Sequence, residues 1–217
     1  MMTARLFVVL MACVLFTSVP AQAQVALLFD NGPMDYENGW EMTWWTEADD
    51  FELAFSAPAT RITMGILDTT CTFPGNWDGV LRWWILNDEA GLPGSTVIAT
   101  GISPQVSFSI SQNDCPSGWA WYEQSFSLGQ QVNLEGGVRY WLAIHMAGDW
   151  SVRRDLYWAT TATGAFNAAA YQTQGVGAWS YTPLLQHAFM ILAHGDDLGI
   201  FSDEFESGSY DIWSSFA

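Results

Sequence analysis

Basic residues are nearly absent from this chain of 217 residues. It contains no lysine and only six arginines, against 23 aspartates and glutamates, so its formal net charge at pH 7 is −17. A surface this acidic repels the phosphates of nucleic acids and the headgroups of anionic lipids. We therefore expect no nucleic-acid partner and no electrostatic attachment to a membrane, while binding of cations stays open.

Long apolar runs are absent outside the first 23 residues. Arg5 is followed by an apolar run over residues 6–16, and Ala21-Gln22-Ala23 has the small-x-small pattern of a signal peptidase site. The run is shorter than the roughly 20 residues of a membrane-spanning helix. The sequence thus predicts a signal peptide over residues 1–23 and an exported mature protein, secreted to the extracellular space or periplasm, without a transmembrane anchor.

Cysteine is also scarce, with three in the whole chain. Cys13 lies in the predicted leader, where residues 10–13, Leu-Met-Ala-Cys, offer a second interpretation as a lipoprotein processing box. The methionine fits that box poorly, and removal of the whole leader is favoured. The two remaining cysteines are too few for a zinc cluster. In an oxidising compartment we expect Cys71 and Cys115 to form a disulfide rather than to supply a catalytic thiol.

Sequence motifs of common catalytic sites are missing. There is no G-x-S-x-G elbow, no Walker loop, no dinucleotide fingerprint and no H-E-x-x-H zinc motif. The seven-residue spacing of His187 and His194 would place them on opposite faces of a strand, and we interpret them and His145 as structural. The sequence therefore predicts a protein that is not an enzyme and has no catalytic residues.

The apolar pattern is that of short β-strands separated by turns. Runs rich in β-branched and aromatic residues alternate with Gly, Pro, Asn, Asp and Ser clusters, and no segment has a sustained helical stripe. The predicted strands cover residues 51–55, 61–67, 80–86, 119–126, 138–146 and 188–193. We expect one domain over residues 24–195, an all-β fold formed by a single antiparallel β-sandwich of jelly-roll-like form.

One predicted strand, residues 138–146, shows its orientation directly. Apolar and mixed positions alternate along it, which is the period of a strand with one face on a core. The predicted core face consists of Tyr140, Leu142, Ile144 and Met146, and the mixed face of Arg139, Trp141, Ala143 and His145. We expect a central strand in which substitutions on the mixed face cost much less stability than those on the core face.

Four short motifs follow one another along the chain. They are Leu-Phe-Asp-Asn-Gly-Pro at 28–33, Glu-Ala-Asp-Asp-Phe at 47–51, Asn-Asp-Glu-Ala-Gly-Leu-Pro-Gly at 87–94 and Gly-Gly-Val-Arg-Tyr-Trp-Leu at 136–142. Together they make the chain from about residue 27 to 195 similar to a group of secreted bacterial β-sandwich proteins that carry various cell-surface anchoring signals. The resemblance implies the sandwich architecture but no chemistry, because the function of these domains is mostly unassigned.

The last segment, residues 196–217, differs in composition from the rest. It mixes acids, Gly and Ser with spaced aromatic residues. Residues 201–208, followed by Trp213-Ser214, resemble the F-x-D-G-F-E-S-G…W-S ending of many exported bacterial proteins, with Glu204 in place of the usual Gly. We expect this acidic and aromatic tail to be dispensable for the fold and to matter for location or attachment.

Tryptophan is abundant, with 13 in the chain. Trp44-Trp45 and Trp83-Trp84 are adjacent pairs, and neighbours in a strand point to opposite faces, so each pair should place one indole in the core and one outside. Exposed indoles are rigid, amphipathic platforms for sugar rings. Further candidates for a carbohydrate-binding surface are Trp77, Trp119, Trp121, Trp150 and Trp179. The alternative is that loops cover the outward rings.

Carboxylates are plentiful but follow no metal-binding pattern. Asp49, Asp50, Asp88 and Glu89 are candidates for a structural calcium ion, with solvated loop acids as the default interpretation. Two acids facing each other across a cleft would instead suit a glycosidase. The leading hypothesis is an exported, non-enzymatic binding or structural module whose partner is an extracellular glycan or a cell-surface component. The alternative is a polysaccharide-acting hydrolase or lyase that uses an Asp/Glu pair.

Overall fold

The computed structural model describes residues 25–103, 106–113, 115, 118–164, 168–175, 177–183 and 185–194. Within these residues the chain forms thirteen β-strands and no helix, so the predicted all-β class is confirmed. The predicted signal peptide, the interpretation of Cys13 and the predicted tail concern residues outside the described ones.

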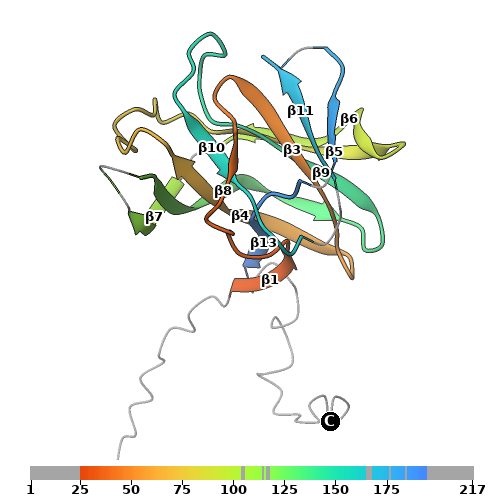
Figure 1. The fold of residues 1–217 in the computed structure, drawn as a ribbon. Coiled ribbons are helices and arrows are strands. Elements are labelled where there is room, and N and C mark those ends of the chain that lie inside the picture. Colours follow the sequence, from red (N-terminus) through yellow and green to blue (C-terminus); the bar gives the residue numbers. More distant parts are fainter. Residues whose placement is uncertain are drawn as a thin grey trace, which may run out of the picture.

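The strands form two antiparallel sheets that pack face to face as a sandwich (Figure 1). The first sheet contains β1 (Val25–Asp30), β2 (Gly39–Glu41), β4 (Ala57–Asp68), β7 (Val106–Asn113), β8 (Ala120–Leu134), β10 (Leu156–Ala159) and β13 (Phe189–His194). The second sheet contains β3 (Trp45–Glu52), β5 (Arg82–Glu89), β6 (Leu92–Ile102), β9 (Arg139–His145), β11 (Ala168–Thr173) and β12 (Ser180–Pro183). The predicted antiparallel sandwich is therefore confirmed.

Strand β4 organises the first sheet. Along one side it pairs with β8, which carries β7 on its far side. On its other side β4 pairs with β13 at residues 61–64 and with β10 at residues 66–68. Strand β1 pairs with the far side of β13, and β2 pairs with the far side of β10. The second sheet has the order β12-β11-β3-β9-β5-β6, so β9 is central, as predicted.

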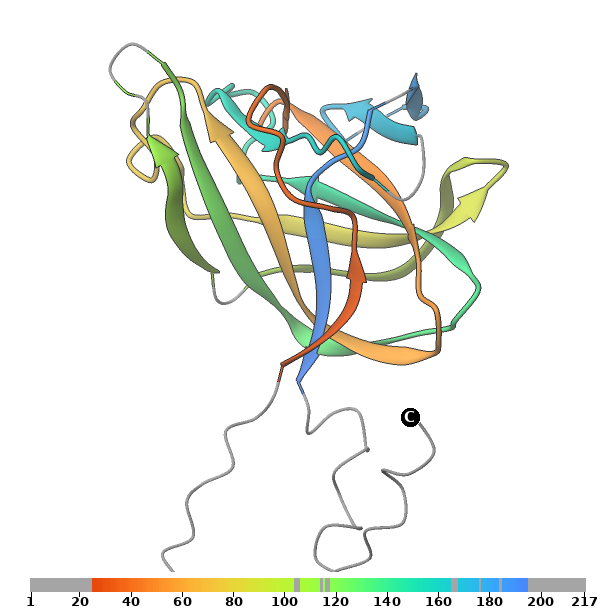
Figure 2. The same cartoon turned by 60° about the horizontal axis from the view of Figure 1, so that its bottom comes forward.

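The two ends of the described chain meet at one end of the sandwich. Val25 pairs with His194, and Figure 2 shows β1 and β13 running side by side there. Strands β10 and β2 lie beside the opposite end of β4. The β10–β2 end is therefore the pole of the sandwich away from both chain ends.

The main core fills the space between the two sheets. Large side chains from both sheets, such as Ile62, Phe51 and Trp83, are fully buried there. Burial of a side chain of this kind contributes about 1.5 to 3 kcal/mol. The four residues predicted to face the core from residues 138–146 all belong to this core, and they are Tyr140, Leu142, Ile144 and Met146.

The opposite face of β9 is buried as well, which corrects the expectation for that face. Trp141, Ala143 and His145 are each 0% exposed. Trp150 stacks on His145 with ring centroids 4.3 Å apart, and further partly buried indoles pack around Trp141. Loops thus cover this outer face and form a second, smaller core, so substitutions at His145 lose packing in the way that core substitutions do.

The acidic segment 47–50 is the largest departure from the predicted strands. Strand β3 runs through it, whereas the predicted strand begins only at residue 51. Glu47, Asp49 and Asp50 are at most 1% exposed. The default interpretation of Asp49 and Asp50 as solvated loop acids is therefore wrong. Strands β1, β2, β6, β7 and β10 to β12 were also not predicted, because they are short or have no clear alternation of apolar and polar residues.

The predicted disulfide is confirmed, since Cys71 and Cys115 are bonded. It ties the loop after β4 to the turn between β7 and β8. The carboxylate of Asp68 accepts backbone N–H groups of that loop, at 2.9 Å from Thr70 and 2.7 Å from Thr72. Covalent and hydrogen bonds therefore hold the loop that follows β4.

Candidate functional site

The segment Gly-Trp-Glu-Met-Thr-Trp-Trp at residues 39–45 passes from the first sheet to the second. Its first three residues form the edge strand β2, and Trp45 begins β3. Met42, at the crossing, is 0% exposed and belongs to the core. Its backbone N–H donates to Leu156 O at 3.0 Å, which holds the crossing beside β10. Because the crossing is fixed in this way, the tryptophans on either side of it are held close together.

These tryptophans line a pocket of about 120 Å³ at the β10–β2 end of the sandwich. The pocket is bounded by Gly39, Trp40, Glu41, Trp44, Trp45, Arg153 and Tyr157. The ring of Tyr171 on β11 lies 6.0 Å from Trp40 and 5.3 Å from Trp45, and those two indoles lie 6.3 Å apart. Aromatic rings from both sheets therefore back one partly exposed hollow.

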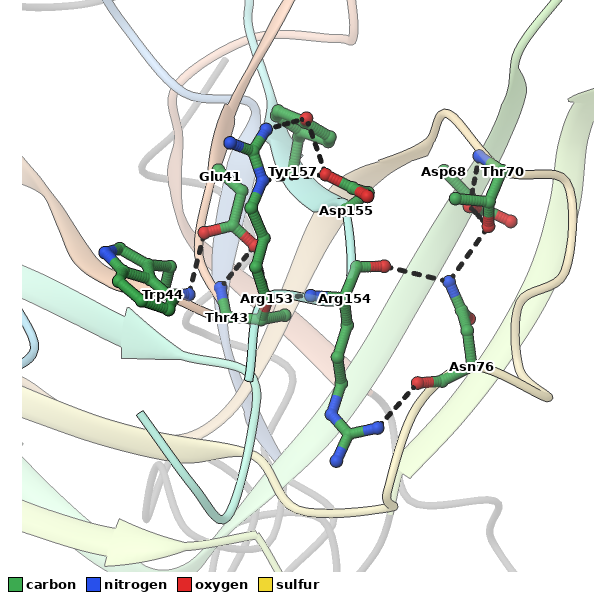
Figure 3. A network of polar contacts seen from close by, with 10 residues as sticks. All are labelled: Glu41, Thr43, Trp44, Asp68, Thr70, Asn76, Arg153, Arg154, Asp155 and Tyr157. Atoms are coloured by element: carbon green, nitrogen blue, oxygen red, sulfur yellow. Dashed lines mark hydrogen bonds and ion pairs between the residues drawn. The ribbon is translucent and has the colours of Figure 1, made fainter. Parts of the chain in front are cut away.

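Glu41 shapes the turn that presents Trp44 to this pocket. One carboxylate oxygen accepts the backbone N–H of Thr43 at 3.1 Å and also its hydroxyl, and the other accepts the backbone N–H of Trp44 at 2.7 Å (Figure 3). Burial raises the pKa of Glu41, and these hydrogen bonds oppose that rise. The side chain is thus engaged by its own turn.

Arg153 forms the charged rim of the pocket. Its Nε donates to Asp155 at 2.7 Å and its Nη2 donates to the hydroxyl of Tyr157 at 2.6 Å (Figure 3). The arginine side chain is 53% exposed. Since a guanidinium has five N–H donors, this network orients the group and leaves donors directed to solvent or a ligand.

Arg154 connects the pocket to the disulfide-bonded loop. Its backbone N–H donates to the hydroxyl of Thr43 at 2.8 Å, and its guanidinium donates to Asn76 O at 3.0 Å and to Asp78 at 3.1 Å. Asn76 donates in return to Arg154 O at 3.0 Å and to the hydroxyl of Thr70 at 3.1 Å (Figure 3). The turn that carries Trp44 is therefore braced by the loop after β4.

A buried polar cluster lies between the two sheets. Glu47 and His187 are both 0% exposed, with 3.8 Å between Glu47 Oε2 and His187 Nε2. Burial raises the pKa of Glu47 well above its ordinary value and lowers the pKa of His187 to about 3, so burial disfavours the charged form of each group. The ring of Trp158 stacks on His187 at 4.5 Å. Its full burial makes this cluster part of the fold and not a contact surface for a ligand.

The five tryptophans predicted as a carbohydrate-binding surface do not form one surface. Trp77 packs on Phe73 in the loop after β4, with ring centroids 5.8 Å apart, and its indole N–H donates to Val80 O. Trp150 and Trp179 cover the outer face of the second sheet. On the first sheet, Trp119 is 43% exposed and lies against Trp121, which is only 2% exposed.

The two tryptophan pairs behave differently from each other. Trp83 is fully buried in the main core, and Trp84 packs on the opposite face, as predicted. Trp44 and Trp45 are both partly exposed and both line the pocket, so neither is the expected core residue. Three tryptophans at positions 40, 44 and 45, with the core residue Met42 between them, are the sequence signal of this pocket that was missed.

The four acids predicted as calcium ligands are spread over different surroundings. Asp49 points between the sheets and Asp50, its neighbour in β3, points to the opposite face, so the two do not bind one ion together. Asp88 accepts the indole N–H of Trp141 at 2.9 Å, and Glu89 accepts the backbone N–H of Ser95. Within the part of the chain that the structure describes, no three His, Cys, Asp or Glu side chains are grouped to hold a metal ion.

Asp50 gives the fold a pH dependence that can be measured. Burial raises the pKa of Asp50 to about 6 from 3.8, although Arg139, whose Nη1 lies 3.5 Å away, opposes the shift. The folded protein therefore keeps this proton to a higher pH than the unfolded chain does. Its contribution to the free energy of unfolding is largest below about pH 4 and is lost as the pH rises through about 6.

We expect Asp50→Asn to stabilise the protein at neutral pH, because asparagine carries no charge to bury. The difference in unfolding free energy from wild type should be small near pH 4 and reach about 3 kcal/mol above pH 6, at about 1.4 kcal/mol for each pKa unit. Chemical denaturation of both proteins across this range measures the difference. Parallel curves at all pH values would contradict the assigned burial of Asp50.

Comparison with models of known protein families gives no match, and comparison with curated proteins gives none either. Among the described residues, no helix is long and apolar enough to cross a membrane. The interpretation of the pocket therefore depends on its own geometry and chemistry.

Proposed function

We propose that this protein is an exported, non-enzymatic β-sandwich module that binds a glycan through the aromatic pocket. The observation that carries the proposal is the pocket itself, in which three indoles and a tyrosine ring surround a hollow edged by Arg153 and Glu41. Flat, amphipathic rings suit the faces of a sugar, and a few polar groups at the rim suit its hydroxyls. A volume of about 120 Å³ favours a single ring or small group over a long buried ligand.

Three observations support an extracellular setting. The disulfide between Cys71 and Cys115 is of a kind that persists in oxidising compartments. The predicted signal peptide and the resemblance to secreted bacterial sandwich proteins agree with it. In addition, the pocket lies at the pole away from Val25 and His194, so a module attached through either chain end would present the pocket outward.

Binding is favoured over hydrolysis by the state of the nearest carboxyls. Glu41 uses both of its oxygens to hold residues 43 and 44. Glu47, whose carboxyl lies close enough to Glu41 for that group to raise its pKa further, is 0% exposed and does not line the pocket. A glycosidase needs two carboxyls that reach the scissile bond. Release of reducing sugar from a bound polysaccharide would overturn the non-enzymatic part of the proposal.

The test is a glycan array followed by calorimetry with the best ligand. We expect Trp44→Ala to weaken binding at least about tenfold, which corresponds to about 1.4 kcal/mol of lost stacking. Phe55→Ala is the matched control, because this aromatic side chain is 57% exposed and lies in the turn between β3 and β4, at the other pole. Equal affinities of the two variants would rule out the pocket as the binding site.

A further inference from the structure

A second pocket lies on the outer face of the first sheet. Its volume is about 220 Å³. Part of its lining comes from the segment that follows β1, namely Gly32, Pro33, Met34 and Tyr36. The polar part of its lining is Asp30, Tyr36, Thr63, Ser111 and Glu123. The hydroxyls of Tyr36 and Ser111 lie 2.7 Å apart, and Tyr36 is 42% exposed. The pocket is thus open, rich in hydroxyl and carboxylate groups and edged by an aromatic ring.

The register of the first sheet places this pocket next to the aromatic pocket. Gly39, which lines the aromatic pocket, pairs with Ala159 on β10. Ala159 in turn lies beside Gly65 on β4, which lines the second pocket and pairs with Glu123. Neighbouring strands are about 4.8 Å apart, so Gly39 and Gly65, two strands apart, are separated by about 10 Å.

An apolar bridge joins the two pockets. It consists of Met34, Leu67, Trp121, Tyr157 and Ala159, which pack together on the outer face of the first sheet. Met34 also lines the second pocket, where it occupies the space that a side chain at Gly65 would need. Tyr157 also lines the aromatic pocket. Leu67, Trp121 and Ala159 are at most 2% exposed, so a ligand that extends from one pocket to the other passes over the partly exposed Met34 and Tyr157.

We propose that the two pockets are subsites of one face that binds a neutral oligosaccharide. This inference rests on the proposed function. One sugar ring occupies the aromatic pocket, the chain crosses the bridge at Tyr157, and a later ring meets the hydroxyl and carboxylate groups around Tyr36. Sugar rings have apolar faces and polar edges, which matches two polar-edged hollows joined by the exposed parts of Met34 and Tyr157.

The charges at the two pockets favour a neutral ligand over an acidic one. Asp30 and Glu123 line the second pocket, and among the described residues neither forms an ion pair. Glu41 lines the aromatic pocket, whose cation Arg153 is already paired with Asp155 at 2.7 Å. With a net charge of −17 on the chain, uronic acids and sulfated sugars would be repelled.

The experiment compares ligand length with pocket variants. Calorimetry uses cello-, manno- and chito-oligosaccharides from monosaccharide to hexasaccharide, with oligogalacturonides as the acidic arm. For wild type we expect affinity to rise at least about tenfold with chain length, because the second subsite is reached intramolecularly. Tyr36→Ala and Glu123→Ala should each reduce this gain and leave monosaccharide binding unchanged, whereas Trp44→Ala should weaken every ligand. Thermal unfolding of each variant checks that it is folded. If one of the two variants does not fold, the other still tests the second subsite.

The outcomes separate this inference from the proposed function. Two results would overturn the two-subsite inference and leave the aromatic pocket as the binding site. One is an affinity for neutral sugars that does not depend on their length. The other is an affinity for long sugars that neither Tyr36→Ala nor Glu123→Ala changes. Tighter binding of oligogalacturonides would overturn the neutral ligand class. Absence of binding to every sugar would overturn the proposed function and this inference with it.

Discussion

Replacing Asp49 with alanine is expected to lower the free energy of unfolding by about 3 to 5 kcal/mol. Asp49 is 0% exposed, and its carboxylate accepts the backbone N–H of His187 and the side-chain amide of Asn31 at 3.3 Å. It also accepts the backbone N–H of Asp50 at 2.8 Å. Truncation would leave the backbone N–H groups of His187 and Asp50 without this acceptor, and each orphaned donor costs about 1 to 3 kcal/mol. The amide of Asn31 keeps two other acceptors, Gln186 Oε1 and His187 O. Urea denaturation followed by tryptophan fluorescence measures the loss.

Asp49→Asn is the matched control for this result. Burial raises the pKa of Asp49 well above its ordinary value, so the site favours an uncharged group. An asparagine side chain retains an acceptor oxygen and carries no charge, and it should cost clearly less than alanine. A loss below about 1 kcal/mol for Asp49→Ala would contradict the assigned contacts between β3 and the segment before β13.

Removal of the disulfide is expected to cost about 4 kcal/mol in the chain-entropy model. Cys71 and Cys115 are 44 positions apart, so their bond restricts a long loop in the unfolded chain. The double variant Cys71→Ala with Cys115→Ala should therefore unfold at a clearly lower denaturant concentration than the oxidised protein. The reduced wild type is the control, because it lacks the bond but keeps both cysteine side chains.

Thiol titration supplies an independent check on the same bond. The denatured, unreduced protein that begins after the predicted leader should contain no free sulfhydryl, because Cys71 and Cys115 are paired. Two reactive thiols, or a double variant as stable as the oxidised protein, would contradict the structural role of the bridge. The loop that the bridge holds also braces Arg154 through Asn76, so under the proposed function the double variant should in addition bind a glycan more weakly.

Local patterns were enough to predict the elements whose side chains alternate clearly. The pattern of residues 138–146 predicts a strand with one apolar face. Strand β9 forms within this range, with Leu142 in the core. The pair Trp83-Trp84 splits between two faces for the same reason. The cysteine pairing was predicted from a count of two cysteines after the predicted leader. These features depend on residues close in sequence or on simple elimination.

The buried acids of β3 could not be predicted from local pattern. A run such as Glu-Ala-Asp-Asp is typical of a solvated loop, since burial of a carboxylate is costly. The cost is offset here by donors from distant parts of the chain, such as Asn31 and His187, which no window around Asp49 contains. The prediction from composition therefore failed where tertiary hydrogen bonds decide burial.

The pocket was missed for a related reason. It requires Trp40 from one sheet, Trp45 from the other and Tyr157 from a strand more than a hundred residues later. The same long-range packing buries indoles that were candidates for exposure, as with Trp121 at 2% exposure. Sequence alone indicated tryptophan-rich surfaces, but which rings share a hollow depends on how the two sheets meet at their edge.

The central claim is that the indoles at the β10–β2 end bind a sugar. The most direct test is to titrate the isotope-labelled protein with a sugar and to follow the NMR signals of the indole N–H groups. With the best oligosaccharide from the array, the signals of Trp40, Trp44 and Trp45 should shift in proportion to saturation. Those of Trp84 and Trp179, which pack on the outer face of the second sheet, should stay in place. Shifts confined to Trp84 and Trp179, or no shift at saturating ligand, would contradict the account.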